Sequence, residues 1–166
     1  MKDRIIHYTK EVLLFFIVLT LFANLISYYK SFDLNKAPLL NVQATLLDGS
    51  SFTTTSIKKP LLIHFWAVWC PTCKLEADNI ERISKLYNVV TIVVKSGSDK
   101  DIQSYLQEHN FNFKVINDEN GFLVQRFNIS AYPTTFIYDK NANLAFSEVG
   151  YTSSLGLILR MWWAGL

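Results

Sequence analysis

The feature that most constrains the fold is a pair of cysteines, Cys70 and Cys73, directly behind the apolar run Leu61 to Trp66. A continuous apolar run of this length, bounded by a proline, predicts a buried central strand, and the residues after Cys73 predict a helix. Pro71 suits the first helical position, where its missing N–H costs nothing. The sequence therefore places a dithiol where a buried strand leads into a helix.

The position of Cys70 favours a reactive sulfur. Its sulfur is expected to lie against the free N–H groups and the partial positive charge of the helix start. Cysteines at such positions have pKa values of roughly 3.5 to 7.5, against about 8.5 for a free thiol. We interpret the pair as a redox dithiol that needs no other cofactor, with Cys70 as the exposed nucleophile and Cys73 as the resolving thiol.

Three other interpretations of the pair stay open. A structural disulfide over so short a loop adds only roughly 2 kcal/mol, against nearly 5 kcal/mol for a 100-residue loop. A structural zinc site needs about four ligands, and His7, His64 and His109 supply no suitable histidine pair. A copper(I) site suits soft thiolates, but no methionine flanks the motif. The redox dithiol is favoured, and no metal is expected.

An uncharged apolar stretch near the N-terminus, residues 12–29, predicts a membrane span. About 18 such residues are enough to cross a bilayer as a helix. Lys2, Arg4 and Lys10 precede the stretch, so the positive-inside rule predicts a cytoplasmic N-terminus.

The net charge of the whole chain, +2, argues against a nucleic-acid partner.

A cleaved signal peptide and a buried core helix are the two alternatives to an uncleaved anchor. A cleaved signal peptide has a shorter apolar region that ends in a small-x-small site, and Ala23 has no small residue two positions before it. The predicted organisation is a cytoplasmic N-terminus (1–11), a transmembrane anchor (12–29), a linker (30–36) and one exported domain (37–166). An exported domain lies in an oxidising compartment, where disulfides persist.

Within the domain, Asp48-Gly49 is a strong hairpin-turn signal. The expected strands are 43–47, 51–55, 61–66, 89–94, 113–116, 133–138 and 143–149, and the expected helices are 70–87, 99–109, 119–127 and 153–163. A β-α-β half followed by a β-hairpin and a C-terminal helix is the order of a thioredoxin-like α/β fold. We therefore expect a central mixed sheet flanked by helices, an N-terminal β-hairpin and one preceding transmembrane helix.

The motif FWAVWCPTCKLE, from Phe65 to Glu76, resembles that of membrane-anchored, exported thioredoxin-like proteins, the TlpA, ResA and cytochrome c maturation (DsbE) group. Segments 94–97, 115–118 and 150–163 are most similar to the suppressor-of-copper-sensitivity protein D (ScsD) branch. The resemblance implies thiol:disulfide exchange with periplasmic proteins at the bacterial inner membrane. It also implies a membrane electron donor of the DsbD/ScsB type and a link to copper tolerance.

The sequence places Glu76 on the buried face of the predicted helix. Cys73, Glu76, Ile80, Ile83 and Tyr87 recur at intervals of three and four, so they share the face that packs on the sheet. Burial would raise the pKa of the Glu76 carboxyl. We expect Glu76 to accept the proton of Cys73, and the family carries an acidic residue at this place. The alternative is a boundary residue that reaches solvent.

Taken alone, Pro133 is a strand-entry proline. The resemblance implies instead a cis Tyr132–Pro133 bond, in a loop that faces the dithiol and offers its backbone to a bound peptide. Trp69, Pro71, Thr72 and Tyr132 are the expected substrate-binding residues. The haem-maturation relatives usually carry an acidic residue where this chain has Thr134, which weakens an apocytochrome-reducing role. That role and a copper(I) chaperone without redox cycling are the remaining functional alternatives.

Two further sets of residues are expected in the core. His64 stands where soluble thioredoxins carry a buried acid, and we expect a neutral histidine bonded to backbone or water, with tuning of the dithiol as the alternative. Trp66 is expected to pack in the core. Helical spacing predicts that four residues of the last helix also pack on the sheet, with membrane contact through Trp162 and Trp163 as the alternative. Those four are Leu155, Ile158, Leu159 and Trp162.

Overall fold

A five-stranded mixed sheet forms the centre of the domain in the computed structural model, which describes residues 2–30, 34, 38–56 and 60–166. The strand order is β5-β4-β3-β6-β7. The strands are β3 (Leu61–Trp66), β4 (Asn88–Val94), β5 (Lys114–Asp118), β6 (Thr134–Tyr138) and β7 (Leu144–Val149). β3 pairs in parallel with β4, and β4 with β5, while β6 is antiparallel to both β3 and β7. This arrangement confirms the predicted thioredoxin-like α/β fold.

Every residue of the central strand β3 is buried, which is why the sequence reads as one continuous apolar run. Alternate side chains enter two different cores. Ile63 and Phe65 join a cluster with Leu123 and Phe127, whereas Leu62 joins a cluster on the other face. The strand therefore holds both layers of the domain together, and it ends immediately before the cysteine motif.

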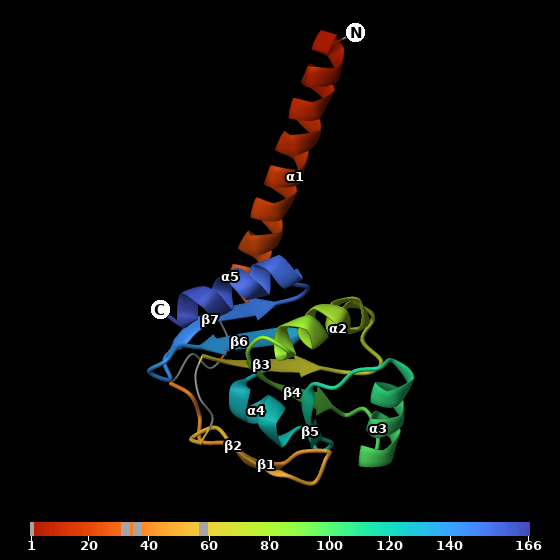
Figure 1. Ribbon diagram of the computed structural model, residues 1–166, viewed down its shortest axis with the longest axis vertical. Coiled ribbons are helices and arrows are strands. Elements are labelled where there is room, and N and C mark those ends of the chain that lie inside the picture. Colours follow the sequence, from red (N-terminus) through yellow and green to blue (C-terminus); the bar gives the residue numbers. More distant parts are fainter. Residues whose placement is uncertain (1, 31–33, 35–37, 57–59) are drawn as a thin grey trace.

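Helices cover both faces of the sheet (Figure 1). They are α2 (Pro71–Ser84), α3 (Asp99–Glu108), α4 (Phe122–Phe127) and α5 (Ser154–Ala164). The buried side chains of α2, α3 and α5 share one cluster, and those of α4 share the other with the hairpin β1 (Gln43–Thr45) and β2 (Ser51–Thr53). The hairpin was predicted from Asp48-Gly49, and Gly49 does adopt the left-handed conformation that the turn requires, with φ of 82°.

The N-terminal part of α4 was predicted too early, at residue 119. Asp118 ends β5, and Gly121 adopts the left-handed conformation with φ of 72°, so the helix begins only at Phe122. The Asp118 carboxylate accepts the backbone N–H groups of Leu123 and Val124 at 3.1 and 2.9 Å. A side chain before the turn therefore stabilises the free N–H groups of the first helical turn.

The prediction for the last helix was wrong in its rotational phase. Leu155, Leu159 and Trp162 were expected to pack on the sheet, but they are 66%, 55% and 56% exposed, while Ile158 is half-buried. The residues that face the core are Leu157, Met161 and Ala164. Both sets recur at helical intervals in an almost wholly apolar segment, so the pattern alone does not say which face is buried.

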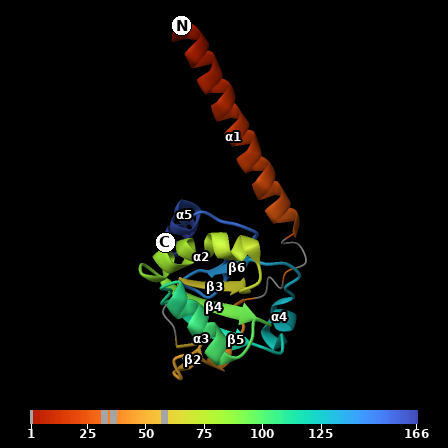
Figure 2. The same ribbon diagram turned by 90° about the vertical axis from the view of Figure 1, so that its right-hand side faces the viewer.

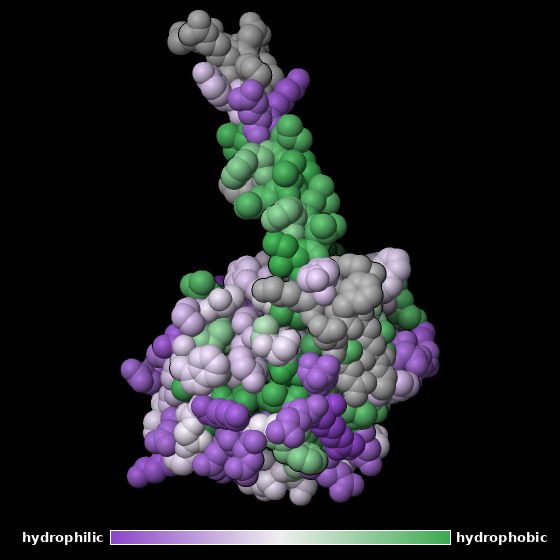
Figure 3. All heavy atoms as spheres, turned by 180° about the vertical axis from the view of Figure 1, so that it is seen from behind, coloured by the Kyte–Doolittle hydropathy of each residue, from purple (hydrophilic) through white to green (hydrophobic). Residues whose placement is uncertain are grey.

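The N-terminal helix α1 (Lys2–Lys30) projects from the domain as one rod (Figures 1 and 2). Its segment Tyr8–Ser27 is long and apolar enough to cross a membrane by length and composition. Figure 3 shows this apolar band between a short polar stretch of α1 and the domain. The last turns contact β7, where the Val149 N–H donates to Ser27 Oγ at 2.9 Å. Most of the predicted linker, 30–36, lies outside the described residues.

Candidate active site

Cys70 and Cys73 form a disulfide at the junction of β3 and α2. Cys70 is the N-cap of α2 and Pro71 its first residue, as the sequence predicts. The backbone N–H of Cys73 donates to Cys70 Sγ at 3.2 Å. A hydrogen bond and the positive end of the helix would both stabilise a thiolate on Cys70.

Cys70 is more enclosed than the sequence suggested, whereas Cys73 is buried on the core-facing side of the helix, as expected. Cys70 was expected to be exposed, but it is only 5% exposed, and Cys73 is 2% exposed. The side chains around the opening are those predicted to bind substrate. Trp69 is 56% exposed, Pro71 is exposed, and Thr72 and Tyr132 are half-buried. A partner sulfur must therefore approach Cys70 past this rim.

The Tyr132–Pro133 peptide bond is cis, as the family resemblance implies. The carbonyl oxygen of Tyr132 lies 3.8 Å from Cys70 Sγ, so this loop is packed against the dithiol. The rings of Trp69 and Tyr132 meet nearly edge-on with centroids 5.8 Å apart, and Trp69 Nε1 donates to the carbonyl of Lys95 at 3.2 Å. The fold thus brings two segments 62 residues apart to one opening.

Glu76 is fully buried on the core-facing side of α2, one turn after Cys73. Its Oε1 accepts the backbone N–H of Thr152 at 3.2 Å, and its Oε2 has no hydrogen-bond partner among the described residues. Burial raises the pKa of Glu76 to about 8; the Thr152 bond opposes this shift, and the charge of Glu148 adds to it. Glu76 therefore holds a proton at neutral pH while the cysteines form a disulfide.

Glu148 is a contributor that the sequence reasoning missed. It lies on β7, where Oε1 accepts Arg160 Nε at 2.8 Å and Oε2 accepts the hydroxyl of Ser27 at 3.1 Å. Its charge acts on the buried Glu76 carboxyl and adds to the rise in the pKa of Glu76. No local motif around Glu148 signals this influence, since the two residues lie in separate elements.

His64 is buried on β3, and its Nδ1 lies 2.9 Å from Thr135 Oγ1 on the neighbouring strand β6. Burial lowers the pKa of His64 to about 3, so the ring is neutral at physiological pH. The partner is a side chain rather than the backbone or water that the sequence suggested. Trp66, on the same strand, is 3% exposed and packs edge-on against Phe113 with ring centroids 5.8 Å apart.

Thr135→Val is expected to lower the free energy of unfolding by about 1–3 kcal/mol, because the buried His64 ring loses its hydrogen-bond partner. Denaturant unfolding of the full chain in detergent micelles at pH 7 measures this. Thr91→Val is the matched control: Thr91 pairs with His64 across β3 and β4, and its buried Oγ1 has no hydrogen-bond partner among the described residues. Equal losses in both variants would contradict a stabilising His64–Thr135 bond.

Among the described residues, no group of three or more His, Cys, Asp or Glu side chains could hold a metal ion. The only soft metal ligands that the described site offers are the sulfurs of Cys70 and Cys73. The chemistry that the observed geometry supplies directly is that of an enclosed disulfide, a helix start, a cis-proline loop and a proton on Glu76.

Comparison with known proteins agrees with this geometry. Residues 34–147 match the AhpC/TSA family. The chain is 30% identical over 135 residues to a thioredoxin-like protein of Haemophilus influenzae, covering 80% of this chain and 77% of that protein. It is 24% identical over 131 residues to the thiol-disulfide oxidoreductase ResA of Bacillus cereus, covering 75% of each.

Among solved structures, a secreted Mycobacterium tuberculosis disulfide oxidoreductase homologous to Escherichia coli DsbE superposes with a TM-score of 0.65. The two chains are 26% identical, and the match covers 73% of this chain and 94% of that one. The solved structure shares the fold, and the cited relatives are similar in sequence over 75–80% of the chain. The chain belongs to the AhpC/TSA family, as a thioredoxin-like thiol-disulfide oxidoreductase.

Proposed function

We propose that this chain is a membrane-anchored oxidoreductase of the periplasm that exchanges its Cys70–Cys73 pair with the thiols and disulfides of partner proteins. The single observation that carries the proposal is the position of Cys70 Sγ. It accepts the Cys73 N–H at 3.2 Å at the start of α2 and lies 3.8 Å from the carbonyl of Tyr132 in the cis-proline loop. One sulfur is thereby both stabilised as a thiolate and set beside a backbone that a peptide can approach.

In the reducing direction, the Cys70 thiolate attacks one sulfur of a partner disulfide. A bond forms between Cys70 and that sulfur, and the partner's other sulfur leaves as a thiolate. In molecules whose Glu76 carboxyl is ionised, Cys73 then loses its proton to that carboxylate and attacks Cys70 Sγ, which releases the partner's second sulfur and closes the Cys70–Cys73 disulfide. Two electrons pass to the partner, and the reverse steps oxidise a partner dithiol.

When a donor dithiol reduces the chain, Glu76 works in the opposite sense. The donor thiolate attacks Cys70, and Cys73 leaves as a thiolate on the buried side of the pair. Glu76 is protonated below about pH 8 in the disulfide form and can return its proton to that sulfur. We propose a donor of the DsbD/ScsB type in the same membrane, in line with the ScsD-like segments of the sequence, and a role in copper tolerance.

Apocytochrome reduction is a second candidate within the same chemistry. Thr134 follows the cis-proline and is buried, with its hydroxyl bonded to the carbonyl of Ala131 at 2.8 Å. It supplies no charge where the haem-maturation relatives usually carry an acid. This observation favours other periplasmic thiol proteins as the partners.

The membrane anchor is tested by alkaline extraction of membranes from cells that make the full chain. We expect the chain to stay in the membrane pellet, because the apolar side chains of Tyr8–Ser27 cover a bilayer-length helix. Leu14→Asp with Leu19→Asp should release it, since a charge at the centre of a span costs about 2.5–3.5 kcal/mol. Leu86→Asp, at an exposed leucine of the domain, is the control. A shortened chain in the soluble fraction would show a cleaved signal instead.

The exchange function is tested by following the pair with a thiol-reactive maleimide that changes electrophoretic mobility. The reduced full chain in detergent is mixed with a disulfide-bonded protein such as insulin, or titrated with copper(I). We expect insulin to convert both cysteines to the unreactive disulfide while the insulin chains become reduced. Stoichiometric copper(I) binding without any transfer of electrons to insulin would support the chaperone alternative and contradict the proposal.

A further inference from the structure

The outward face of α5 is apolar and uncovered. Four large side chains on it are more than half exposed: Leu155 (66%), Leu159 (55%), Trp162 (56%) and Trp163 (64%). Opposite them, Leu157 and Met161 are fully buried against the sheet. The helix therefore carries apolar residues on both sides. No other part of the described chain covers the outer side.

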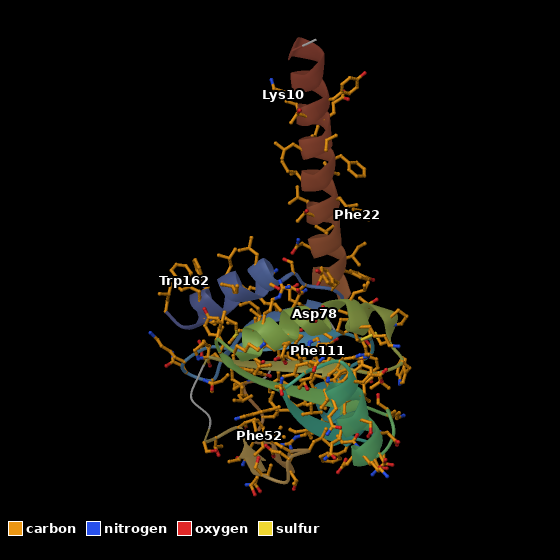
Figure 4. The ribbon with its side chains drawn as sticks, turned by 45° about the vertical axis from the view of Figure 1, so that its right-hand side comes forward. Lys10, Phe22, Phe52, Asp78, Phe111 and Trp162 are labelled. Atoms are coloured by element: carbon orange, nitrogen blue, oxygen red, sulfur yellow. A yellow bond between two sulfur atoms is a disulfide. The ribbon has the colours of Figure 1, made fainter. Side chains whose placement is uncertain are left out.

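This face lies where α1 meets the domain. The Glu148 carboxylate accepts Arg160 Nε of α5 through one oxygen and the hydroxyl of Ser27, in α1, through the other. A single side chain thus joins α5 to the last turns of the apolar helix. In both ribbon views α5 lies on the side of the domain from which α1 leaves (Figures 1 and 2), and Figure 4 shows Trp162 on that side.

The chemistry of the face matches a lipid boundary. Residues 153–166 contain no acidic side chain, and their one basic side chain, Arg160, is already paired with Glu148. Tryptophan is enriched at the boundary between headgroups and acyl chains, because its ring is apolar and its N–H is polar. Lys140 contacts the carbonyl oxygen of Leu166, so a cation lies beside the end of α5, where it can meet lipid phosphates.

We infer that α5 is a membrane-interface helix. Its face of Leu155, Leu159, Trp162 and Trp163 inserts into the boundary of the bilayer that α1 crosses, an inference that rests on the proposed anchor. Amphipathic helices lie in this plane with their apolar side buried in the headgroup region. The helix α5 packs on α2, and the dithiol lies at the start of α2 with Cys70 as its N-cap. The membrane contact of α5 therefore fixes the distance and orientation of the Cys70 opening relative to the bilayer. A donor in the same membrane then meets the dithiol in one orientation.

The inference is tested with the full chain reconstituted in phosphatidylcholine vesicles whose acyl chains are brominated near the headgroup. Bromine quenches tryptophan emission on contact, and we expect clear quenching of the wild-type chain. Trp162→Phe with Trp163→Phe should lose most of that quenching while keeping the face apolar. Trp69→Phe, which removes the other exposed tryptophan, should keep it. Aqueous acrylamide should reach Trp69 but not the α5 pair.

Three outcomes would overturn the inference in different ways. If acrylamide reaches the α5 tryptophans and bromolipid does not, while the chain still resists alkaline extraction, the anchor stands and α5 faces water. If alkali extracts the chain, the anchor and the lipid contact both fail. Shielding of the pair from acrylamide and bromolipid alike, growing with protein concentration, would assign the face to a second copy and also overturn the lipid contact.

Discussion

Cys70→Ser is expected to abolish transfer of electrons to a protein disulfide, because a serine hydroxyl forms no mixed disulfide and Cys73 is almost fully enclosed. Cys73 is 2% exposed, and it lies behind Cys70 at the helix start. Reduction of insulin by the full chain in detergent, with a dithiol as electron source, should fall to the rate seen without the chain. The loss should be complete, since the enclosed Cys73 is the one cysteine that remains in the sequence of this variant.

Asp78→Asn is the matched control for this loss. Asp78 lies on the same helix α2, is exposed (Figure 4), and takes no part in the proposed exchange. We expect it to keep the wild-type rate. Substantial insulin reduction by Cys70→Ser would mean that Cys73 can start the exchange by itself, and the unequal roles assigned to the two sulfurs would be wrong.

Glu76→Gln is expected to slow reduction of the Cys70–Cys73 disulfide by about 100-fold at pH 7, the lower range for loss of a positioned acid or base. The carboxyl is buried, its pKa is raised to about 8, and one oxygen has no hydrogen-bond partner among the described residues. In the wild type the rate should carry an inflection near pH 8 that the Gln variant lacks. Stopped-flow mixing of the oxidised chain with a small dithiol from pH 6 to 9 measures both.

Asp78→Asn should again leave the rate and the inflection in place. A profile that keeps its inflection in Glu76→Gln would contradict proton transfer through Glu76, because a merely structural role would change the rate without removing a titration. The thiol pKa of the attacking dithiol adds its own pH dependence, which the comparison between variants removes.

Glu76→Gln should also change the free energy of unfolding, and the direction of this change with pH follows from the raised pKa of Glu76. The folded-state pKa of Glu76, about 8, lies above the usual 4.5, so the folded chain binds the proton more tightly. Its stabilising contribution is complete below pH 4.5 and is lost as the pH rises through 8. The full loss is about 4–5 kcal/mol. Glu76→Gln should therefore unfold at higher denaturant than the wild type above pH 8, and at similar denaturant below pH 5.

Glu81, on the same helix, should contribute stability with the opposite pH dependence from that of Glu76. Burial acts to raise its pKa, but the N–H of Asn112 at 2.8 Å and the ion pair with Lys85 at 3.1 Å together lower it. The stability that Glu81 contributes is therefore present above pH 4.5 and lost as the pH falls below that. Glu81→Gln should be destabilising at pH 8, where Glu76→Gln is stabilising. Equal effects of both substitutions would contradict the opposite pKa shifts.

Much of the fold could be predicted because the strongest signals were local. The run Leu61–Trp66 is buried on both sides, and such a strand needs apolar residues at nearly every position, His64 being the exception here, so its bounds were predicted without error. The burial of Glu76 followed from its three- and four-residue spacing with Cys73 and Ile80 on one helical face. The helix start at Pro71 followed from proline chemistry.

The rest depends on contacts between segments far apart in the chain. Thr135 bonds His64 only because β6 pairs with β3 in one register, and a sequence does not state which residues will be opposite each other. Glu148 reaches the surroundings of Glu76 for the same reason. The phase of α5 failed because both of its faces are apolar, so burial was decided by tertiary packing and left Trp162 outside.

The central claim, that Cys70 exchanges disulfides with partner proteins, is tested most directly with Cys73→Ser made in the native bacterium. Without the resolving thiol, the mixed disulfide on Cys70 cannot be released by Cys73 and should accumulate. Non-reducing electrophoresis and mass spectrometry of the purified chain should show partner proteins joined through Cys70, released by a reductant and absent from the Cys70→Ser, Cys73→Ser double variant. If no Cys70-dependent adduct accumulates in growing cells, the exchange mechanism is wrong.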